Sequence, residues 1–427
     1  MKILCLVDKY FPDSSANTIC ADNIANFFKA KGHQFDFLAI KNSADDLDYS
    51  VHNGSNIIKI GTYYDEVLKK YGKKYNAKSW MELPWFFRKS RSFFQRIKRF
   101  TRISTGYSSL DVLDYNDLYK KIIKINKHYD CLITFCMPFA FQIIGKELME
   151  RGIADKWYPI FLDAFVYNKC LAQSKINYRK KVAEKVLEKA NHIFMVDGIV
   201  NENKKQGFNP DYHKNVTEIY IPILKEMSLP KMKKTTIKKT LIYAGLFYKD
   251  IRNPEKMLNI LSKLSSECEV KIFGQGCEDI VSEKKNLFNK SSLNIGGLIS
   301  HDECLKEISK ADFLINLGNS ITNQMPSKVF EYISFGKPII NFYFTEEDMC
   351  LDVFKKYPLA FNVNVNNYTK EDIEKLNKFI NENNGKLLSY EEATKNLKDY
   401  KVENIADKIY RIMVEQWKKL SQERKIV

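Results

Sequence analysis

The chain has 427 residues, two to three times the length of an ordinary domain of roughly 150 residues, so two domains are expected. Apolar residues make up 44%, aromatic residues 13% and charged residues 28%, a composition that excludes disordered, collagen-like and small disulfide-stapled proteins. The formal net charge is +16 and belongs almost entirely to residues 1–240; residues 51–110 alone hold 13 basic and 3 acidic side chains. An anionic partner is therefore expected for this region.

Several features predict a cytoplasmic protein. The nine cysteines form no CxxC pair and several lie in apolar runs, as reduced and buried thiols do. The apolar run at 3–7 is too short for a signal peptide. The longest apolar stretch, 131–145, contains Pro138 and Gln142 and is shorter than the ~20 residues that span a bilayer. Membrane contact is expected to be peripheral.

In chain order, the first half alternates between short apolar runs and helical patterns, which is typical of a parallel sheet covered on both faces. Residues 1–226 are predicted to form one α/β domain, with a basic insertion at about 42–128. Its expected strands are 3–7, 35–40, 131–135, 158–162 and 193–196, and its expected helices are 19–30, 139–150 and 178–190.

A Lys- and Thr-rich stretch at 227–240 is interpreted as a linker to a second α/β domain at 241–400. There the expected strands are 241–244, 270–273, 293–295, 313–317 and 338–342, and the expected helices are 254–264, 280–286, 302–309 and 327–334. Residues 401–427 are expected to form a helix that packs back on the first domain. Two doubly wound sheets would face each other across a cleft at the carboxyl ends of their strands, where such folds bind ligands.

The segment 319–340 (NSITNQMPSKVFEYISFGKPII) is the most informative. A helix that starts at Pro326 would leave the amides of Ser327 and Lys328 free at its positive end, which favours a phosphate. Glu331 shares a helix face with these two residues and would lie where a nucleotide places its ribose. The alternative reading of Glu331 is an exposed helix carboxylate.

This segment and others resemble the GT-B glycosyltransferases of retaining family 4. The other matching runs are MKILCLVDKYFP at the start, YAGLFYKDIRNPEKML (243–258), KIFGQG (271–276) and GGLISHDECLKEISKADFLINLGN (296–319). The resemblance covers nearly the whole chain in the family's order. It implies a nucleotide-sugar donor in the second domain, an acceptor in the first, transfer with retention, and no required metal.

The resemblance also implies roles for individual residues. Glu331 matches the second glutamate of the family's E-x7-E element, which contacts the ribose, whereas the first falls on Asn323, beside the transferred sugar. The Arg of the family's Arg/Lys pair is replaced by Leu246, after Gly245, and Arg252 lies near the position of the Lys. Arg252 and Lys328 are expected to compensate the charge of the leaving diphosphate. Donor contacts are also expected at Gly245, Gly274, Gly276, Gly297, Leu298 and Ser327.

On the acceptor side the signals are weaker. Asn17, in the loop after the first strand, and Asp163, after the strand at 158–162, are candidates; Asp163 as a helix N-cap is the alternative. No histidine follows the strand at 131–135, so no catalytic histidine is carried over, and the six histidines are interpreted as structural or surface residues.

Residues 85–102 hold seven basic residues, six aromatic residues and no acidic residue. This composition is typical of a helix in an anionic membrane interface, and the alternative is a helix that packs its aromatic face on the sheet. Nucleic acid is disfavoured because no binding motif is present. The membrane-facing candidates are Trp85, Phe86, Arg88, Lys89, Phe93, Arg96 and Phe100.

The sequence therefore predicts a transferase that moves a hexose-type sugar from a nucleoside diphosphate, with UDP favoured, to a lipid-linked or glycan acceptor on the inner face of the cell membrane. Cell-surface polysaccharide or glycolipid assembly is the expected context. Two alternatives stay open: a nucleotide-sugar 2-epimerase of the same fold, and a non-catalytic nucleotide-binding subunit of a transferase complex, which the departures at Leu246 and Asn323 favour.

Overall fold

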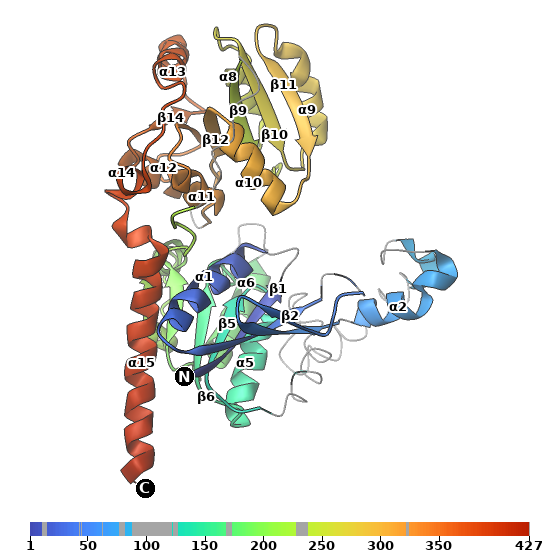
Figure 1. Ribbon diagram of the computed structural model, residues 1–427, viewed down its shortest axis with the longest axis vertical. Helices are drawn as coiled ribbons and strands as arrows, with labels where there is room; N and C mark the ends of the chain where they lie inside the picture. The colour runs from blue at the N-terminus through green and yellow to red at the C-terminus, as the bar shows by residue number, and fades with distance from the viewer. Residues whose placement is uncertain are drawn as a thin grey trace. The chain divides into compact units, whose positions relative to one another are not determined.

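The computed structural model divides the chain into two compact units (Figure 1). Unit 1 comprises Met1–Pro222 and Ile405–Val427, and unit 2 comprises Ile223–Asn404. The structure describes residues 1–10, 15–41, 43, 45–61, 63–76, 82–87, 122, 127–167, 173–227, 238–321 and 324–426, without the side chains of 63–66, 421 and 424–426. Most of the predicted linker lies outside these ranges.

Unit 1 is built on an eight-stranded sheet in the order β3-β4-β2-β1-β5-β6-β7-β8. All neighbouring strands are parallel except the β3–β4 hairpin. The chain builds outward from β1 in one direction and then returns to β5 on its other side, so the topological switch point lies between β1 and β5. The strands are β1 (Lys2–Lys9), β2 (Gln34–Ile40), β3 (Tyr49–His52), β4 (Ser55–Ile60), β5 (Tyr129–Cys136), β6 (Ala154–Phe161), β7 (Ile193–Val196) and β8 (Val216–Ile219).

The helices of unit 1 cover this sheet, and the long C-terminal helix α15 belongs to them for nearly all of its length (Figure 1). Tyr410 of α15 packs edge-on against Phe28 of α1 at 5.2 Å between ring centroids, which joins the end of the chain to its beginning. The helices are α1 (Ala16–Ala30), α2 (Tyr63–Tyr75), α5 (Ala140–Glu150), α6 (Gln173–Leu187), α7 (Asp197–Lys205), η3 (Asp211–Asn215) and α15 (Val402–Ile426).

Unit 2 is built on a six-stranded parallel sheet in the order β11-β10-β9-β12-β13-β14. Here the switch point lies between β9 and β12. The elements are β9 (Lys239–Ala244), α8 (Glu255–Leu261), β10 (Cys268–Phe273), α9 (Glu278–Lys284), η4 (Lys285–Leu287), β11 (Ser292–Gly297), α10 (His301–Lys310), β12 (Phe313–Leu317), α11 (Lys328–Ser334), β13 (Ile339–Tyr343), α12 (Met349–Lys356), β14 (Ala360–Asn364), α13 (Lys370–Glu382), α14 (Tyr390–Thr394) and η5 (Lys398–Tyr400).

The central strands of both sheets are buried and mainly apolar, such as β12, whose five residues are all buried and include one polar residue, Asn316. Burial on both faces explains why these strands show no polar alternation. The predicted α/β class with two doubly wound sheets is confirmed.

Candidate functional site

The candidate site lies at the carboxyl ends of β9 and β12, where the direction of the sheet in unit 2 reverses. Arg252 comes from the β9–α8 connection and Asn319 from the β12–α11 connection. Arg252 Nε donates to Asn319 Oδ1 at 2.9 Å, so one hydrogen bond joins the two loops across the switch point. Open crevices at such points are where doubly wound sheets bind ligands.

Two further contacts fix Arg252. Its guanidinium also donates to the carbonyl of Leu246 at 3.3 Å, and the backbone of Ser320 donates to Ile251 at 2.8 Å. Asn319 is 1% exposed, and its side-chain amide donates to the carbonyl of Gln324 at 2.7 Å. Arg252 is thus a cation whose position is fixed by hydrogen bonds.

Helix α11 follows the same loop and carries Lys328 and Glu331. Lys328 Nζ contacts Glu331 Oε2 at 2.6 Å, and the Glu331 side chain is 8% exposed, which contradicts the alternative reading of an exposed carboxylate. Burial disfavours the charge on Lys328, but the Glu331 carboxylate outweighs it and leaves the pKa of Lys328 above its ordinary value. Ser327 stands at the N-cap without a side-chain capping bond.

The glycine turns after β9 and β10 pack against each other. A Cβ atom on Gly274 would lie 1.8 Å from the carbonyl oxygen of Gly245, and one on Gly276 would lie 2.3 Å from that of Phe247. Both glycines also have positive φ, +155° and +97°. These positions therefore require glycine for a close approach of two backbones, and this brings the ends of β9 and β10 to the site.

The connection from β11 to α10 brings a further group toward α11. β11 ends at Gly297, and the next residue, Leu298, is 68% exposed. His301, at the start of α10, lies within electrostatic reach of Lys328 and Glu331. Partial burial lowers the pKa of His301, and Lys328 lowers it further while Glu331 opposes both. His301 is exposed, in agreement with the sequence interpretation of the histidines as structural or surface residues, and its place near α11 follows from the path of the chain.

The acceptor-side candidates lie in unit 1. Asn17 is inside α1 rather than in the preceding loop, because Ser15 caps the helix and starts it earlier than predicted. Its Nδ2 donates to the Met137 carbonyl at 3.3 Å, which joins the helix after β1 to the loop after β5 at the switch point of this sheet. Asp163 lies half-buried after β6, and the described residues that follow it, 164–167, form no helix. Asn323 lies outside the described residues.

Of the predicted membrane residues, Trp85 and Phe86 are described and are 61% and 46% exposed. They follow a small apolar cluster built around Val67 of α2 and Leu83. The other five, at 88, 89, 93, 96 and 100, lie outside the described residues. Among the described helices, none has the length and apolar content to cross a bilayer.

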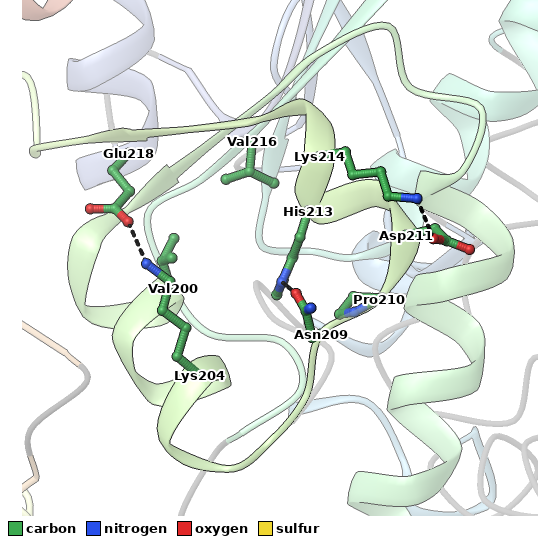
Figure 2. A pocket seen from close by; sticks show the side chains of 9 residues that line it. All are labelled: Val200, Lys204, Asn209, Pro210, Asp211, His213, Lys214, Val216 and Glu218. Atoms are coloured by element: carbon green, nitrogen blue, oxygen red, sulfur yellow. Dashed lines mark hydrogen bonds and ion pairs between the residues drawn. The ribbon is translucent and has the colours of Figure 1, made fainter.

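A separate pocket of about 360 Å³ lies in unit 1 between α7, η3 and β8 (Figure 2). Its charged side chains are paired within the lining: Lys204 contacts Glu218 at 3.2 Å and Lys214 contacts Asp211 at 2.9 Å. Asn209 accepts from His213 Nδ1 at 3.2 Å, and burial lowers the pKa of His213. The two lysines of this pocket are therefore both paired with acidic side chains of its own lining. It is lined by Val200, Lys204, Asn209, Pro210, Asp211, His213, Lys214, Val216 and Glu218.

Comparison with known proteins identifies the fold. No family model and no curated protein matches the sequence, but solved structures match almost end to end. A sucrose-phosphate synthase from Thermosynechococcus elongatus has a TM-score of 0.61 at 12% identity, covering 97% of this chain and 99% of that one. These neighbours are GT-B glycosyltransferases. The chain has the GT-B fold.

Two other GT-B structures were solved with nucleotide or sugar ligands. Anabaena HepE in complex with UDP and glucose has a TM-score of 0.55 at 10% identity, with full coverage of both chains. The E. coli trehalose-6-phosphate structure bound with UDP-2-fluoro glucose has a TM-score of 0.58 at 9% identity, covering 97% of this chain and 99% of that one. The fold predicted from the sequence resemblance is thereby confirmed.

Proposed function

We propose that this GT-B protein is a retaining glycosyltransferase that moves a hexose-type sugar from a nucleoside diphosphate, preferably UDP, to a saccharide acceptor. The observation that carries the proposal is the Arg252–Asn319 bond of 2.9 Å across the switch point of unit 2, with the Lys328–Glu331 pair on the helix that follows. Two solved structures with this fold hold UDP or a UDP-sugar, which supports the choice of nucleotide.

The residues divide the work according to their chemistry. As the glycosidic bond breaks, the diphosphate gains negative charge, and fixed cations lower the barrier to its departure. Arg252 and Lys328 supply this charge. Glu331 accepts hydrogen bonds from the ribose hydroxyls, and the Asn323 side-chain amide hydrogen bonds to hydroxyl groups of the transferred sugar. With retention, the leaving phosphate oxygen takes the acceptor proton, so the reaction needs no strong protein base. Because Arg252 and Lys328 compensate the diphosphate charge, it also needs no metal.

The first experiment is a thermal-shift screen with UDP-, GDP- and TDP-sugars on wild type and Glu331→Ala. We expect one nucleotide to stabilise the wild type and to lose most of its effect on the variant. Glu267→Ala, an exposed carboxylate at the amino end of β10, is the matched control and should respond like wild type. A response to no nucleotide would contradict the proposal.

A second assay separates the three candidate activities. A transferase releases free UDP only when an acceptor membrane fraction is present, whereas a 2-epimerase converts the donor without an acceptor. A non-catalytic subunit binds UDP and turns over no donor under either condition. Acceptor-dependent UDP release is the expected result, and donor turnover without acceptor would favour the epimerase.

We further propose that the acceptor is lipid-linked and that unit 1 docks on the cytoplasmic face of an anionic membrane during cell-surface polysaccharide or glycolipid assembly. The exposed rings of Trp85 and Phe86 stand beside α2, whose Lys69, Lys70, Lys73 and Lys74 are all exposed. Aromatic rings with adjacent lysines suit the interface of anionic lipids, where each cation contributes about 1 kcal/mol.

Vesicle flotation tests this docking surface. Wild type should float with phosphatidylglycerol-containing vesicles and not with pure phosphatidylcholine, and Trp85→Ala/Phe86→Ala with Lys73→Glu/Lys74→Glu should lose at least about tenfold in binding. Lys386→Glu/Leu387→Ala, an exposed basic and apolar pair in unit 2, should float like wild type. Equal flotation of both variants would refute the docking surface and would leave the proposed donor site unaffected.

A further inference from the structure

The β13–α12 connection buries a carboxylate that no predicted role uses. Asp348 is 3% exposed. Its Oδ1 caps α12 by accepting from the backbone of Cys350 at 2.8 Å, but its buried Oδ2 has no hydrogen-bond partner. A capping role needs one oxygen only, so the second oxygen is unexplained by the fold.

The unpartnered oxygen faces the donor loop. A Cβ atom built on Gly318 would lie 1.8 Å from Asp348 Oδ2, so this oxygen lies against the backbone immediately before Asn319. Asn319 in turn accepts the hydrogen bond from Arg252 at 2.9 Å. Asp348 therefore lies behind the loop that holds the cation of the proposed diphosphate site.

The charged and titratable groups around Asp348 are few. Arg252 attracts its negative charge, Asp352 of α12 repels it, and the buried Cys350 thiol hydrogen bonds to the carboxylate. On the same connection, Glu346 accepts from Tyr343 at 3.0 Å and faces β14 through Asn364. Among the described residues, Arg252 is the cation whose charge acts on Asp348. Burial raises the pKa of Asp348 to about 6, although the Cys350 amide and Arg252 oppose this.

We propose that Asp348 is a positioning residue for Arg252 that takes up a proton from solvent when a nucleoside diphosphate binds. In the free protein the ionised carboxylate and the guanidinium compensate each other. A bound diphosphate brings negative charge to Arg252 and repels Asp348, which then accepts one proton and becomes a neutral acid. The neutral Asp348 no longer attracts the Arg252 guanidinium, so the positive charge of Arg252 interacts with the diphosphate alone. This inference rests on the proposed function because it requires a diphosphate at Arg252.

Calorimetric titration with UDP-glucose tests the proposal, since its diphosphate diester does not itself titrate near neutral pH. Measurements in buffers of different ionisation enthalpy report the protons exchanged. Wild type should take up protons at about pH 7, and its Kd should rise by up to about tenfold per pH unit between about pH 6 and about pH 8. Asp348→Asn should show little uptake and a flat Kd.

Two variants make the result specific. Glu374→Gln removes an exposed carboxylate of α13 in the same unit and should behave like wild type. Asp348→Ser keeps a capping oxygen without a titratable group and replaces Asp348→Asn should that variant not fold. Undiminished proton uptake in the Asp348 variants would overturn the inference while leaving donor binding intact. Failure of wild type to bind UDP-glucose or any GDP- or TDP-sugar would instead overturn the proposed function and this inference with it.

Discussion

Arg252 shows how a single side chain acquires a role from its partners. It hydrogen bonds to Asn319 and to the carbonyl of Leu246, and its guanidinium lies 5.9 Å from the centroid of the Tyr248 ring. These contacts use the planar, multi-donor geometry that distinguishes arginine from lysine. The charge at this position is thus fixed in direction before any ligand arrives.

Arg252→Lys should therefore impair transfer although it keeps the charge. A lysine ammonium is a point charge that reaches one partner at a time, so the bond between the two loops is lost. We expect kcat/KM to fall by about two orders of magnitude, as for loss of one preorganised donor. Lys249→Ala, at an exposed neighbouring position, should change kcat/KM by less than about twofold. Near-wild-type kinetics of Arg252→Lys would remove Arg252 from the proposed mechanism.

Asp348 makes the stability of unit 2 depend on pH. Its pKa is about 6 in the folded chain against an ordinary value of 3.8, so the folded state holds the proton more tightly than the unfolded state. The free energy of unfolding should fall as pH rises from about 4 to about 6, by a total of about 3 kcal/mol.

Asp348→Asn should accordingly raise the melting temperature at about pH 7.5 and leave it nearly unchanged at about pH 4. The asparagine still caps α12 through its side-chain oxygen. Differential scanning calorimetry at both pH values checks this. A variant that melts below wild type at about pH 7.5 would show that the ionised carboxylate stabilises the fold.

At the scale of elements, α11 is tied to the sheet by one tyrosine. The hydroxyl of Tyr332 accepts from the backbone N–H of Ala244 at 2.8 Å and donates to its carbonyl at 3.3 Å. This places the helix that carries Lys328 and Glu331 against the end of β9. The position of the ion pair relative to Arg252 therefore depends on a contact made by Tyr332, which lies one helical turn after Lys328.

Tyr332→Phe should destabilise unit 2 by about 1–3 kcal/mol, because it leaves a buried backbone donor without its partner. Donor affinity should fall as well, since α11 loses its fixed distance from β9. Tyr343→Phe removes a hydroxyl that bonds to Glu346 on the surface and should cost less than about 0.5 kcal/mol. Equal melting temperatures for the two variants would contradict the anchoring role.

The two glycine turns are a second element-scale feature. Gly274→Ala places a methyl group 1.8 Å from the Gly245 carbonyl oxygen, so one of the two turns must move. Gly385→Ala is the matched control, because it also has positive φ but meets no atom within 4 Å. In both variants the positive φ lowers the free energy of unfolding by about 1 kcal/mol. Any further decrease in Gly274→Ala reports the steric clash with the Gly245 carbonyl. Equal losses would show that the turns separate freely.

At the scale of the whole molecule, the first and last segments of the chain are joined in unit 1. Tyr410 of α15 contacts Phe27 and Phe28 of α1 with ring centroids 6.1 and 5.2 Å apart, and Lys31 lies over its ring at 5.0 Å. The chain thus leaves unit 1, forms unit 2, and returns to complete the first unit. Loss of this contact should affect unit 1 selectively.

Tyr410→Ala should lower the free energy of unfolding of unit 1 by about 2 kcal/mol, since a half-buried aromatic ring is removed. Ligand-free thermal unfolding would then show the transition of unit 1 at a lower temperature and that of unit 2 unchanged. A nucleotide that stabilises unit 2 identifies which transition belongs to it. A shift of the nucleotide-sensitive transition instead would contradict this assignment.

The sequence by itself predicted the central strands, because a strand that is buried on both faces is apolar along its length and is recognised from neighbouring residues alone. β5, β7, β9 and β12 were found in this way. It missed β3, β8 and β14, which lie at the edges of their sheets, where mixed polar and apolar residues suit a strand with one open side. It also missed β4, an interior strand with alternating burial over its first half. Local motifs also led to the prediction of Arg252, Lys328 and Glu331 as donor-site residues.

Only the tertiary structure decided which of these residues act together. Arg252 and Asn319 are 67 positions apart and meet because β12 returns beside β9, a strand order that no local pattern encodes. Asp348 caps α12 with one oxygen, and the path of the chain buries its second oxygen against Gly318. Periodicity and propensity are properties of neighbouring residues, whereas burial, pairing and charge at a site depend on the path of the chain through space.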